Sequence, residues 1–440
     1  MQDYDTINMI FLYNIALFLL HISIKIAALF NPKAKQWVEG RNGIFNKIET
    51  ELAPNSEIPN PQLPKRIWIH VASLGEFEQG RPIIEQLKRG TEESSVVRPL
   101  IILTFFSPSG YEIRKNYPLA DHIFYLPLDT ASNAKQFLDL VKPDIAIFIK
   151  YEFWFHYLNT LKKRNIPTLL VSGIFRDKQF SKWHPYAYFL KKMLACFTHF
   201  FVQTPPSVFL LKKQGFDNVT LAGDTRIDRV ATLPQEGRTF PLIEKFVDDA
   251  PIFIGGSTWQ PDEAVILPLL KNEHFKNWKF IFAPHDISEN NIQRLEKSLS
   301  IPFIRYSALE KSVIATHPLP ITHYPLLIID NVGILSALYR YGHIAYIGGG
   351  FGKGIHNTLE PIAYGLPVLF GPKYQKFEEA IRLIGISGGF SISNSEQLLN
   401  KMLFLSDKAN YIVASDAARN YVRENQGATE KVIDYIYKTI

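Results

Sequence analysis

The sequence is poor in cysteine: Cys196 is the only one in 440 residues. A single cysteine excludes an intrachain disulfide and a cysteine metal cluster, and it fits a reducing cytosol. Low-complexity stretches and fixed-period repeats are also missing, which excludes a solenoid. Runs of lysine and arginine and RNA-binding signatures are missing too, which argues against a nucleic-acid partner. We therefore predict no metal and no cofactor, and nothing in the sequence indicates an obligate protein partner.

The chain length and the net charge indicate how many domains to expect and which kinds of partner are possible. A chain of 440 residues is too long for one ordinary core and predicts two domains. The formal net charge of +6 gives a basic protein. An excess of basic over acidic residues is compatible with an anionic lipid or a phosphorylated substrate as partner.

The N-terminal stretch Ile7–Phe30 reads INMIFLYNIALFLLHISIKIAALF and is long enough to cross a bilayer. It has no basic leader and no small-residue cleavage site, so a removed signal peptide is not expected. Asp3 and Asp5 precede it, while Lys33 and Lys35 follow, and this asymmetry places the bulk of the protein in the cytoplasm. We predict a membrane anchor that either spans the membrane or lies in its interface. The alternative is a helix packed on the fold.

Beyond this stretch, short apolar runs alternate with helical patterns, which indicates parallel sheets covered on both faces. The first series begins with RIWIHV and ends near residue 222, and a second begins with IFIG at residue 252. We predict a linker over 41–64, a polar bridge over 232–250 and a C-terminal helix that crosses back. The expected parts are an anchor over 1–40, a first Rossmann-like domain over 41–235 and a second over 236–440. Both are expected to be doubly wound, with ligands at the carboxyl ends of the strands.

The segment HVASLGEFEQG places Glu76 where a strand gives way to a helix. A carboxylate there can take a proton from an attacking hydroxyl, which makes Glu76 a candidate general base. Two other interpretations stay open: Glu76 complements the helix dipole, or Glu78 on another face of the helix is the base.

Two further strand ends in the first series carry charge. Lys150 opens KYEFW after a buried strand, and it either faces a ligand or pairs with Glu152. Arg226 lies in AGDTRID and could hold a carboxylate or phosphate through its fork. An interdomain salt bridge would explain Arg226 equally well.

The second series contains two glycine-rich turns. GGSTWQPDE resembles a phosphate cradle but lacks the lysine of a P-loop. GGGFGKGIHNTLEPIAYGLPVLFGP brings His356, Asn357 and Glu360 to one strand end, where a carboxylate can hold ribose hydroxyls. A tight turn explains the glycines but leaves that polar cluster unexplained.

In their shared order these segments resemble the bacterial 3-deoxy-D-manno-octulosonic acid (Kdo) transferases of glycosyltransferase family 30. The matching segments read VASLGE, KYEFWFH, GDTRID, GSTWQPDE, PHDISEN, DNVGIL and GIHNTLEP. Four positions depart from the family: Lys150 replaces Glu, Arg226 replaces Lys, His285 replaces Arg, and Ile334 stands where the family has an acid.

The resemblance implies a GT-B fold with two domains facing a cleft, and an inverting enzyme at the cytoplasmic face of the inner membrane. It implies the donor CMP-Kdo and a lipid A precursor as acceptor, with Glu76, Lys150 and Arg226 as catalytic residues. The residues implied to hold the donor are Pro284, His285, Val332, Gly333, Ile334, Asn357, Thr358, Leu359 and Glu360. The alternatives are another GT-B lipid-linked sugar transferase that uses a UDP-sugar, and a non-catalytic nucleotide-binding protein.

Overall fold

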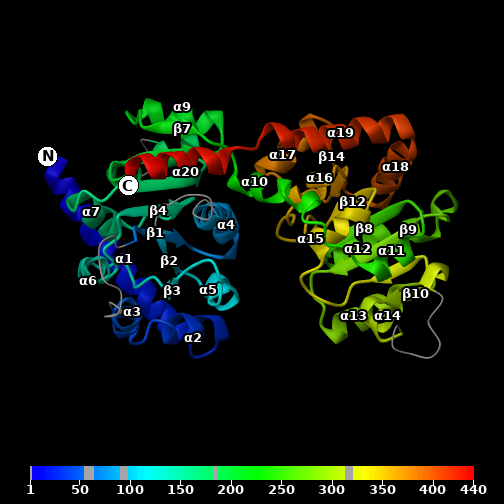
Figure 1. The fold of residues 1–440 in the computed structure, drawn as a ribbon, viewed down its shortest axis with the longest axis horizontal. Helices are drawn as coiled ribbons and strands as arrows, with labels where there is room; N and C mark the ends of the chain where they lie inside the picture. The colour runs from blue at the N-terminus through cyan, green and yellow to red at the C-terminus, as the bar shows by residue number, and fades with distance from the viewer. Residues whose placement is uncertain (1, 54–63, 90–97, 182–185, 313–320) are drawn as a thin grey trace. The chain divides into compact units, whose positions relative to one another are not determined.

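The computed structural model describes residues 2–53, 64–89, 98–181, 186–312 and 321–440. The chain divides into two compact units (Figure 1). The first contains Met1–Asp228 and Gln426–Ile440, and the second contains Arg229–Asn425. The first unit thus ends before residue 235, where we predicted the boundary.

The first unit is built on a seven-stranded parallel sheet in the order β3-β2-β1-β4-β5-β6-β7. Strand β1 pairs with β2 on one side and β4 on the other, so the direction of winding reverses between β1 and β4. The predicted strands are present. Their bounds are β1 Arg66–Val71, β2 Leu100–Phe105, β3 His122–Tyr125, β4 Ile145–Ile149, β5 Thr168–Gly173, β6 His199–Val202 and β7 Val219–Leu221.

Helices cover both faces of this sheet, and each face buries its own apolar cluster. The strand residues are buried throughout β4, which explains why the chain is apolar there without alternation. The helices are α1 Gln2–Ala27, α2 Pro32–Glu39, α3 Ile44–Leu52, α4 Leu74–Arg89, α5 Pro108–Arg114, α6 Ala131–Val141, α7 Phe155–Lys163, α8 Tyr186–Leu194, α9 Pro205–Lys213, α10 Thr225–Ala231 and α20 Ala428–Thr439, where α10 runs into the second unit.

The C-terminal helix α20 belongs to the first unit, where it packs beside α4 (Figure 1). Val432 and Ile436 are buried in the apolar cluster of that sheet face. The Asp228 carboxylate accepts hydrogen bonds from the backbone N–H groups of Gly427 and Thr429, both at 2.6 Å. It thereby caps the helix at its N-terminus, where a negative charge is favoured.

The second unit repeats the plan with a sheet in the order β10-β11-β9-β8-β12-β13-β14. Its winding reverses between β8 and β12, which pair in parallel register. The bounds are β8 Ile252–Thr258, β9 Lys279–Pro284, β10 Phe303–Arg305, β11 Leu326–Ile328, β12 Ile344–Ile347, β13 Val368–Phe370 and β14 Gly389–Ser391. Strand β14 has three residues and was not predicted.

The helices of this unit are α11 Pro241–Val247, α12 Gln260–Ile266, α13 Glu289–Ser298, α14 Tyr306–Ser312, α15 Leu335–Leu338, α16 Leu359–Ala363, α17 Glu378–Gly385, α18 Ser395–Ser406 and α19 Lys408–Glu424. The predicted polar bridge over 232–250 is wrong in its second half, because α11 lies there. Ile243 and Phe246 stand one helical turn apart and are both fully buried, and their packing stabilises the helix.

The predicted linker over 41–64 is also wrong in its first part, because α3 lies there. Ile44 and Ile48 stand four residues apart, on one side of the helix, and both are buried against the core of the first unit. Residues 54–63 lie outside the described part of the chain. The segment therefore belongs to the fold up to Leu52.

Helix α1 is long and apolar enough to cross a membrane over Asn8–Ala27, a stretch of 20 residues. This property follows from the length and the composition of the helix. In the first unit, α1 contacts α2 and runs beside the rings of α7.

Candidate active site

Glu76 lies in the first turn of α4, directly after β1 ends at the carboxyl edge of the first sheet. The Ser73 hydroxyl donates to one oxygen of the half-buried Glu76 carboxylate. Gly75 beside them is exposed, so this turn is open to solvent. Glu78 forms ion pairs with Arg114 at 2.9 Å and Arg81 at 3.5 Å. Two arginines thus engage Glu78, which leaves Glu76 as the better candidate base.

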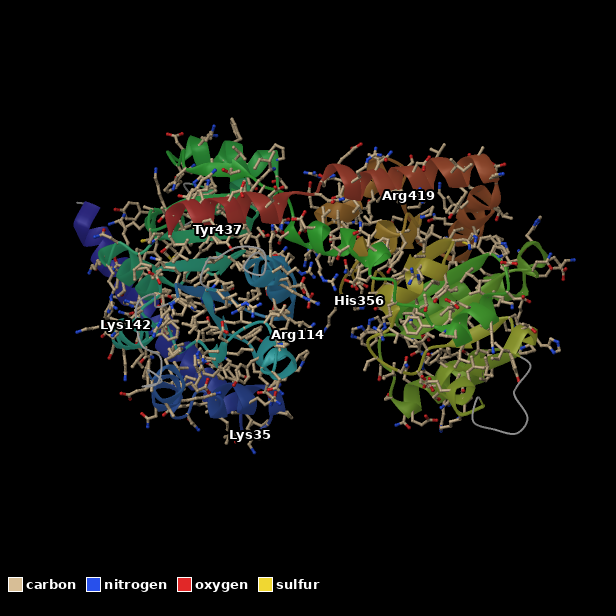
Figure 2. The ribbon with its side chains drawn as sticks, viewed as in Figure 1. Lys35, Arg114, Lys142, His356, Arg419 and Tyr437 are labelled. Atoms are coloured by element: carbon tan, nitrogen blue, oxygen red, sulfur yellow. The ribbon has the colours of Figure 1, made fainter. Side chains whose placement is uncertain are left out.

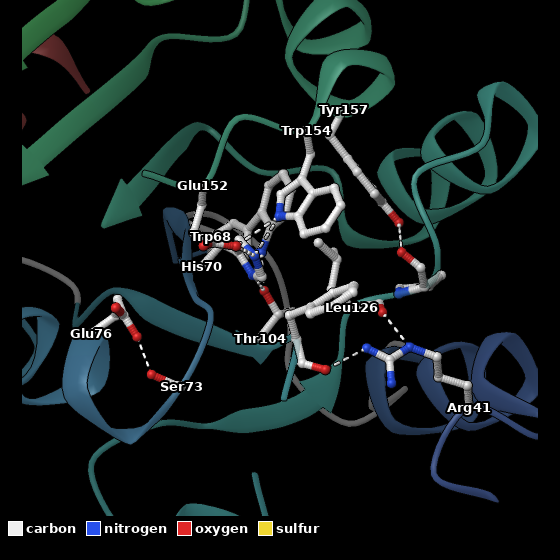
Figure 3. A network of polar contacts seen from close by, with 12 residues as sticks. Arg41, Trp68, His70, Ser73, Glu76, Thr104, Leu126, Glu152, Trp154 and Tyr157 are labelled. Atoms are coloured by element: carbon white, nitrogen blue, oxygen red, sulfur yellow. Dashed lines mark hydrogen bonds and ion pairs between the residues drawn. The ribbon is translucent and has the colours of Figure 1, made fainter. Parts of the chain in front are cut away.

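A hydrogen-bonded network joins the ends of β1 and β4 (Figure 3). Trp68 donates to the Thr104 hydroxyl at 2.8 Å, and that hydroxyl lies 2.9 Å from Nδ1 of the buried His70. The other ring nitrogen of His70 lies 3.2 Å from the Glu152 carboxylate, which also accepts from Trp154 at 2.8 Å. Trp154 also donates to this second ring nitrogen at 3.1 Å, so the Trp154 ring bridges His70 and Glu152.

This network holds Glu152, and Lys150 is not part of it. No hydrogen bond or ion pair joins Lys150 to Glu152 within the described residues, so the simple structural pairing of the two is not what the structure shows. The backbone N–H of Lys150 donates to Val171 of β5 at 2.8 Å. Lys150 has φ of +70°, in the left-handed region that non-glycine residues rarely occupy. Such strain concentrates at functional sites.

Arg226 lies at the start of α10, after the edge strand β7. The Asp224 carboxylate, two residues earlier, accepts from its Nε at 3.0 Å and its Nη2 at 2.5 Å. The Thr225 hydroxyl donates to the carbonyl of Gln79 at 2.6 Å, which holds α10 against α4. The structure therefore brings the start of the Arg226 helix to the helix that carries Glu76, although β1 and β7 are not neighbours in the sheet.

In the second unit, three rings from three adjacent strand ends form a cluster in which each ring contacts the other two. His285 follows β9, Trp259 follows β8 and His356, labelled in Figure 2, follows β12. The His285 ring stacks on Trp259 with centroids 4.6 Å apart and on His356 with centroids 4.5 Å apart. Trp259 Nε1 donates to His356 Nε2 at 3.0 Å. His285 and Trp259 are exposed, so this ring cluster offers a surface to a planar group.

The buried Asp262 holds the two glycine-rich turns together. Its carboxylate accepts from the backbone N–H groups of Trp259 and Gly349, both at 2.9 Å, and from the Tyr346 hydroxyl at 3.0 Å. The backbones approach so closely that a Cβ at Gly348 would lie 2.2 Å from the Ser257 carbonyl oxygen. Glycine is required there because no side chain fits.

The segment Asn357–Glu360 contains two exposed or half-exposed polar residues and two buried ones. Asn357 accepts from the Leu359 N–H at 3.0 Å and donates to Glu360 at 3.1 Å. Thr358 and Leu359 are fully buried. Of the four predicted donor-binding residues here, Asn357 and Glu360 are the two whose side chains a ligand can reach.

The other predicted donor-binding residues lie at the ends of β9 and β11. Pro284 is the buried last residue of β9 and places His285. Val332 is 78% exposed, Gly333 accepts from Arg238 at 3.0 Å, and Ile334 is buried. Val332 and the Gly333 backbone can meet a ligand, whereas Ile334 packs in the core and lacks the charge that the family residue carries.

His70 and Trp259 were not predicted as site residues, and His356 was noted only as part of a polar cluster. The signal for His70 was a histidine in the otherwise apolar strand RIWIHV, where a buried polar group needs partners. Nothing in the sequence showed that Trp259, His285 and His356 would stack, because stacking depends on the order of β9, β8 and β12 in the sheet.

The His356 ring should titrate at unusually low pH. Burial, with the neighbouring His285 as a smaller cause, lowers the pKa of His356 to about 4. Since an unfolded histidine takes up its proton near pH 6.5, the stability of the second unit should be full above that pH and fall between pH 6.5 and 4. We expect the His356 ring resonances to titrate near pH 4 by NMR, together with a change in Trp259 fluorescence. A midpoint near 6.5 would contradict the buried, hydrogen-bonded ring.

Comparisons with known proteins show which sequences and folds this chain is similar to. The sequence profile of the family described as "3-Deoxy-D-manno-octulosonic-acid transferase (kdotransferase)" matches residues 41–229. A 3-deoxy-D-manno-octulosonic acid transferase of Haemophilus influenzae is 25% identical over 94% of this chain and 93% of its own. That of Aquifex aeolicus is 27% identical over 80% of this chain and 89% of its own.

Among solved structures, UDP-GlcNAc 2-epimerase from Neisseria meningitidis bound to UDP-GlcNAc superposes with a TM-score of 0.57. It covers 85% of this chain and 100% of its own, with 15% identity. A likeness at that identity shows the fold alone, and the two seven-stranded parallel sheets are those of the GT-B class. The profile and the relatives together show an enzyme of lipopolysaccharide biosynthesis. Over most of its length the chain is similar to the bacterial Kdo transferases, which are glycosyltransferases.

Proposed function

We propose that the chain transfers Kdo from CMP-Kdo to a hydroxyl of the lipid A precursor, with inversion at the anomeric carbon. The acceptor would be the 6′-hydroxyl of a tetraacylated glucosamine disaccharide bisphosphate. The observation that carries the proposal is the placement of Glu76. This carboxylate stands at an open strand-to-helix turn inside the segment that matches the Kdo transferase profile.

In the proposed step, the acceptor oxygen attacks the anomeric carbon of Kdo from the face opposite CMP. The new C–O bond forms as the bond from that carbon to the CMP phosphate oxygen breaks. The hydroxyl proton passes to Glu76, and CMP leaves with the bonding electrons. Ser73 holds the Glu76 carboxylate by a hydrogen bond, which fixes the oxygen that receives the proton.

Lys150 and Arg226 are proposed to stabilise the negative charge of the Kdo carboxylate and the leaving phosphate. Fixed cations can do this without a metal, because charge that develops in the transition state is met by charge already in place. Arg226 is held by Asp224 and by the bond from Thr225 to α4, so its position is set before the substrate arrives.

The second unit is proposed to bind CMP-Kdo. The exposed rings of His285 and Trp259 offer a stacking surface for the cytosine base. Pro284, the Val332–Ile334 turn and the buried Thr358 and Leu359 shape the surroundings, while Asn357 and Glu360 hold the ribose hydroxyls. The departures at His285 and Ile334 remove two charged groups of the family, so ring stacking would contribute a larger part of the donor affinity here.

Asn357→Ala combined with Glu360→Ala should weaken CMP-Kdo binding by about tenfold to a hundredfold, because two hydrogen bonds to the ligand are lost. Affinity for the lipid acceptor should not change. Calorimetric titration with CMP-Kdo measures the first quantity, and binding to acceptor in vesicles measures the second. Equal losses for both ligands would show that the second unit binds the acceptor.

Helix α1 supports a location at the inner membrane, where a lipid acceptor resides. The bulk of the protein would lie on the cytoplasmic face. It is apolar over 20 residues, and basic residues follow it. A positive surface also favours an acceptor that carries two phosphates.

The decisive experiment combines purified full-length protein, CMP-Kdo and the tetraacylated acceptor, with mass spectrometry of the lipid product. We expect addition of Kdo, and competition by CMP but not by UDP. Competition by UDP alone would favour a transferase that uses a UDP-sugar. Nucleotide binding without any product would indicate a protein that kept the fold and lost the chemistry.

A further inference from the structure

One side of helix α1 lies against the first unit. The side chains that face the unit recur every three or four residues, which places them on one side of the helix. They are Met9, Ile10, Tyr13, Leu17, His21 and Ile24, and each is buried or half-buried. Contact therefore extends over about four turns rather than at one end of the helix.

Polar bonds fasten this side of α1 to the fold. The Tyr13 hydroxyl donates to the Asp129 carboxylate at 2.6 Å, and Asn14 pairs with His156 at 2.7 Å. Asp129 is buried and also accepts from the backbone N–H groups of His156 and Tyr157, at 3.0 and 2.9 Å. If α1 left the unit, Asp129 would lose a partner that its buried carboxylate needs.

The opposite side of α1 is apolar and exposed. Phe11 and Phe18 are each 63% exposed, and Leu12, Leu19, Ile22 and Ile26 share this side. The exposed surface continues through Leu29 and Phe30, and the exposed Lys33 and Lys35 follow at the start of α2. Apolar side chains beside lysines match the two layers of an anionic membrane surface, acyl chains and phosphate headgroups.

A spanning position conflicts with these contacts. A helix that crosses the bilayer is surrounded by hydrocarbon over its whole apolar length. Here one side of that length touches a unit whose neighbouring helices carry charges, such as Lys135 and Asp139 on α6 and Lys162 on α7. Crossing would either strip α1 from the unit or draw these charges into hydrocarbon.

We propose that α1 does not cross the membrane but lies in its surface, as part of the first unit, with the Phe11–Phe18 side in the acyl chains of one leaflet. The occupant of the exposed side is thus the anionic lipid surface. This inference rests on the membrane attachment within the proposed function, and it adds the geometry of that attachment.

The same packing connects the lipid-facing helix to the candidate site. His21 of α1 contacts Trp37 of α2, with ring centroids 6.1 Å apart, and Trp37 contacts Phe106 at 5.7 Å. Phe106 stacks near Trp154 at 4.6 Å, and Trp154 donates to Glu152. The half-buried Arg41 donates hydrogen bonds in this region to the carbonyls of Trp37, Leu126 and Phe106. The site edge of the first sheet is therefore held at a fixed distance from the membrane surface.

The proposal is tested by determining on which side of the membrane Gln2 lies. In a Cys196→Ser background, Gln2→Cys is labelled with a membrane-impermeant maleimide in sealed spheroplasts and after lysis. Lys213→Cys, exposed at the end of α9, reports the side on which the first unit lies. An in-plane helix gives both cysteines the same pattern. Opposite patterns would show a spanning helix and overturn the proposal.

Membrane binding itself needs a second measurement, because an unattached protein would also give equal patterns. Full-length protein should float with vesicles of phosphatidylethanolamine and phosphatidylglycerol, and Phe18→Lys with Leu19→Lys should reduce the bound fraction at least tenfold. Tyr13→Phe with Asn14→Ala should lower the melting temperature of the first unit, which a helix independent of the unit would not do. Failure to float would overturn the proposal, whereas loss of Kdo transfer with intact flotation would count against the proposed function alone.

Discussion

Glu76→Gln should lower the rate of Kdo transfer by at least about a hundredfold, which is the usual contribution of a general base. The amide keeps the size of the side chain and can still accept from Ser73, so the turn at the start of α4 should fold as before. It cannot take up the proton of the acceptor hydroxyl. Binding of CMP-Kdo should be unchanged, and the rate is measured with saturating donor and lipid acceptor.

Glu78→Gln is the matched control, because it makes the same chemical change two residues along the same helix. Glu78 pairs with Arg114 and Arg81, so this variant should lose some stability and keep most of its activity. If Glu76→Gln turns over normally, the base lies elsewhere. Glu152 would be the next candidate, since His70 and Trp154 already hold its carboxylate at the end of β4.

The regular elements could be predicted because both sheets are parallel and buried on both faces. Buried parallel strands are short apolar runs, as in RIWIHV of β1 and IAIFI of β4. Helices α3 and α11 were missed because each is short and buries only two residues that stand one turn apart, in segments where prolines and polar residues dominate. The two-residue signal is too weak to stand out from a loop.

From the sequence, the site could be predicted only as a set of residues that follow the ends of strands. Parallel strands place Glu76, Lys150, His285 and Asn357 at carboxyl edges whatever the order of strands in the sheet. Contacts across the edge depend on that order, and so the bonding of Glu152 to His70 and the stacking of His285 on His356 appeared only in the structure. Arg226 is another such case, because it reaches the region of α4 through the bond from Thr225 to Gln79.

Helix α1 shows a different limit of the sequence. A surface helix usually reveals its buried side through a polar opposite side, but here both sides are apolar. Tyr13 and Leu17 face the unit, while Phe11 and Phe18 are exposed, and hydrophobicity does not separate the two sets. The difference lies in Asp129 and His156, which are far along the chain and meet α1 only in the fold.

Arg226→Ala should cost about 2–4 kcal/mol in transition-state stabilisation, the loss typical of one preorganised donor at a developing charge. Arg226 is 24% exposed and is held by Asp224, so its fork is preorganised at the start of α10. The effect should appear in kcat/KM for Kdo transfer, and it should exceed the effect on CMP affinity, because CMP lacks the Kdo carboxylate. A purely structural pair with Asp224 would instead change stability and leave kcat/KM of the folded enzyme near its normal value.

Arg226→Lys separates charge from geometry at the same position, and it restores the residue that the family carries. Lysine keeps the positive charge but replaces the planar fork with a single ammonium, so two parallel hydrogen bonds to a carboxylate or phosphate are no longer available. We expect this variant to recover more than half of the free energy lost in Arg226→Ala, since the charge accounts for most of the stabilisation. If the lysine variant is as inactive as the alanine variant, the fork itself is required, and Lys150 does not compensate for its loss. If the alanine variant is as active as the unaltered enzyme, Arg226 serves only to pair with Asp224. The charge-stabilising role would then be assigned to Lys150.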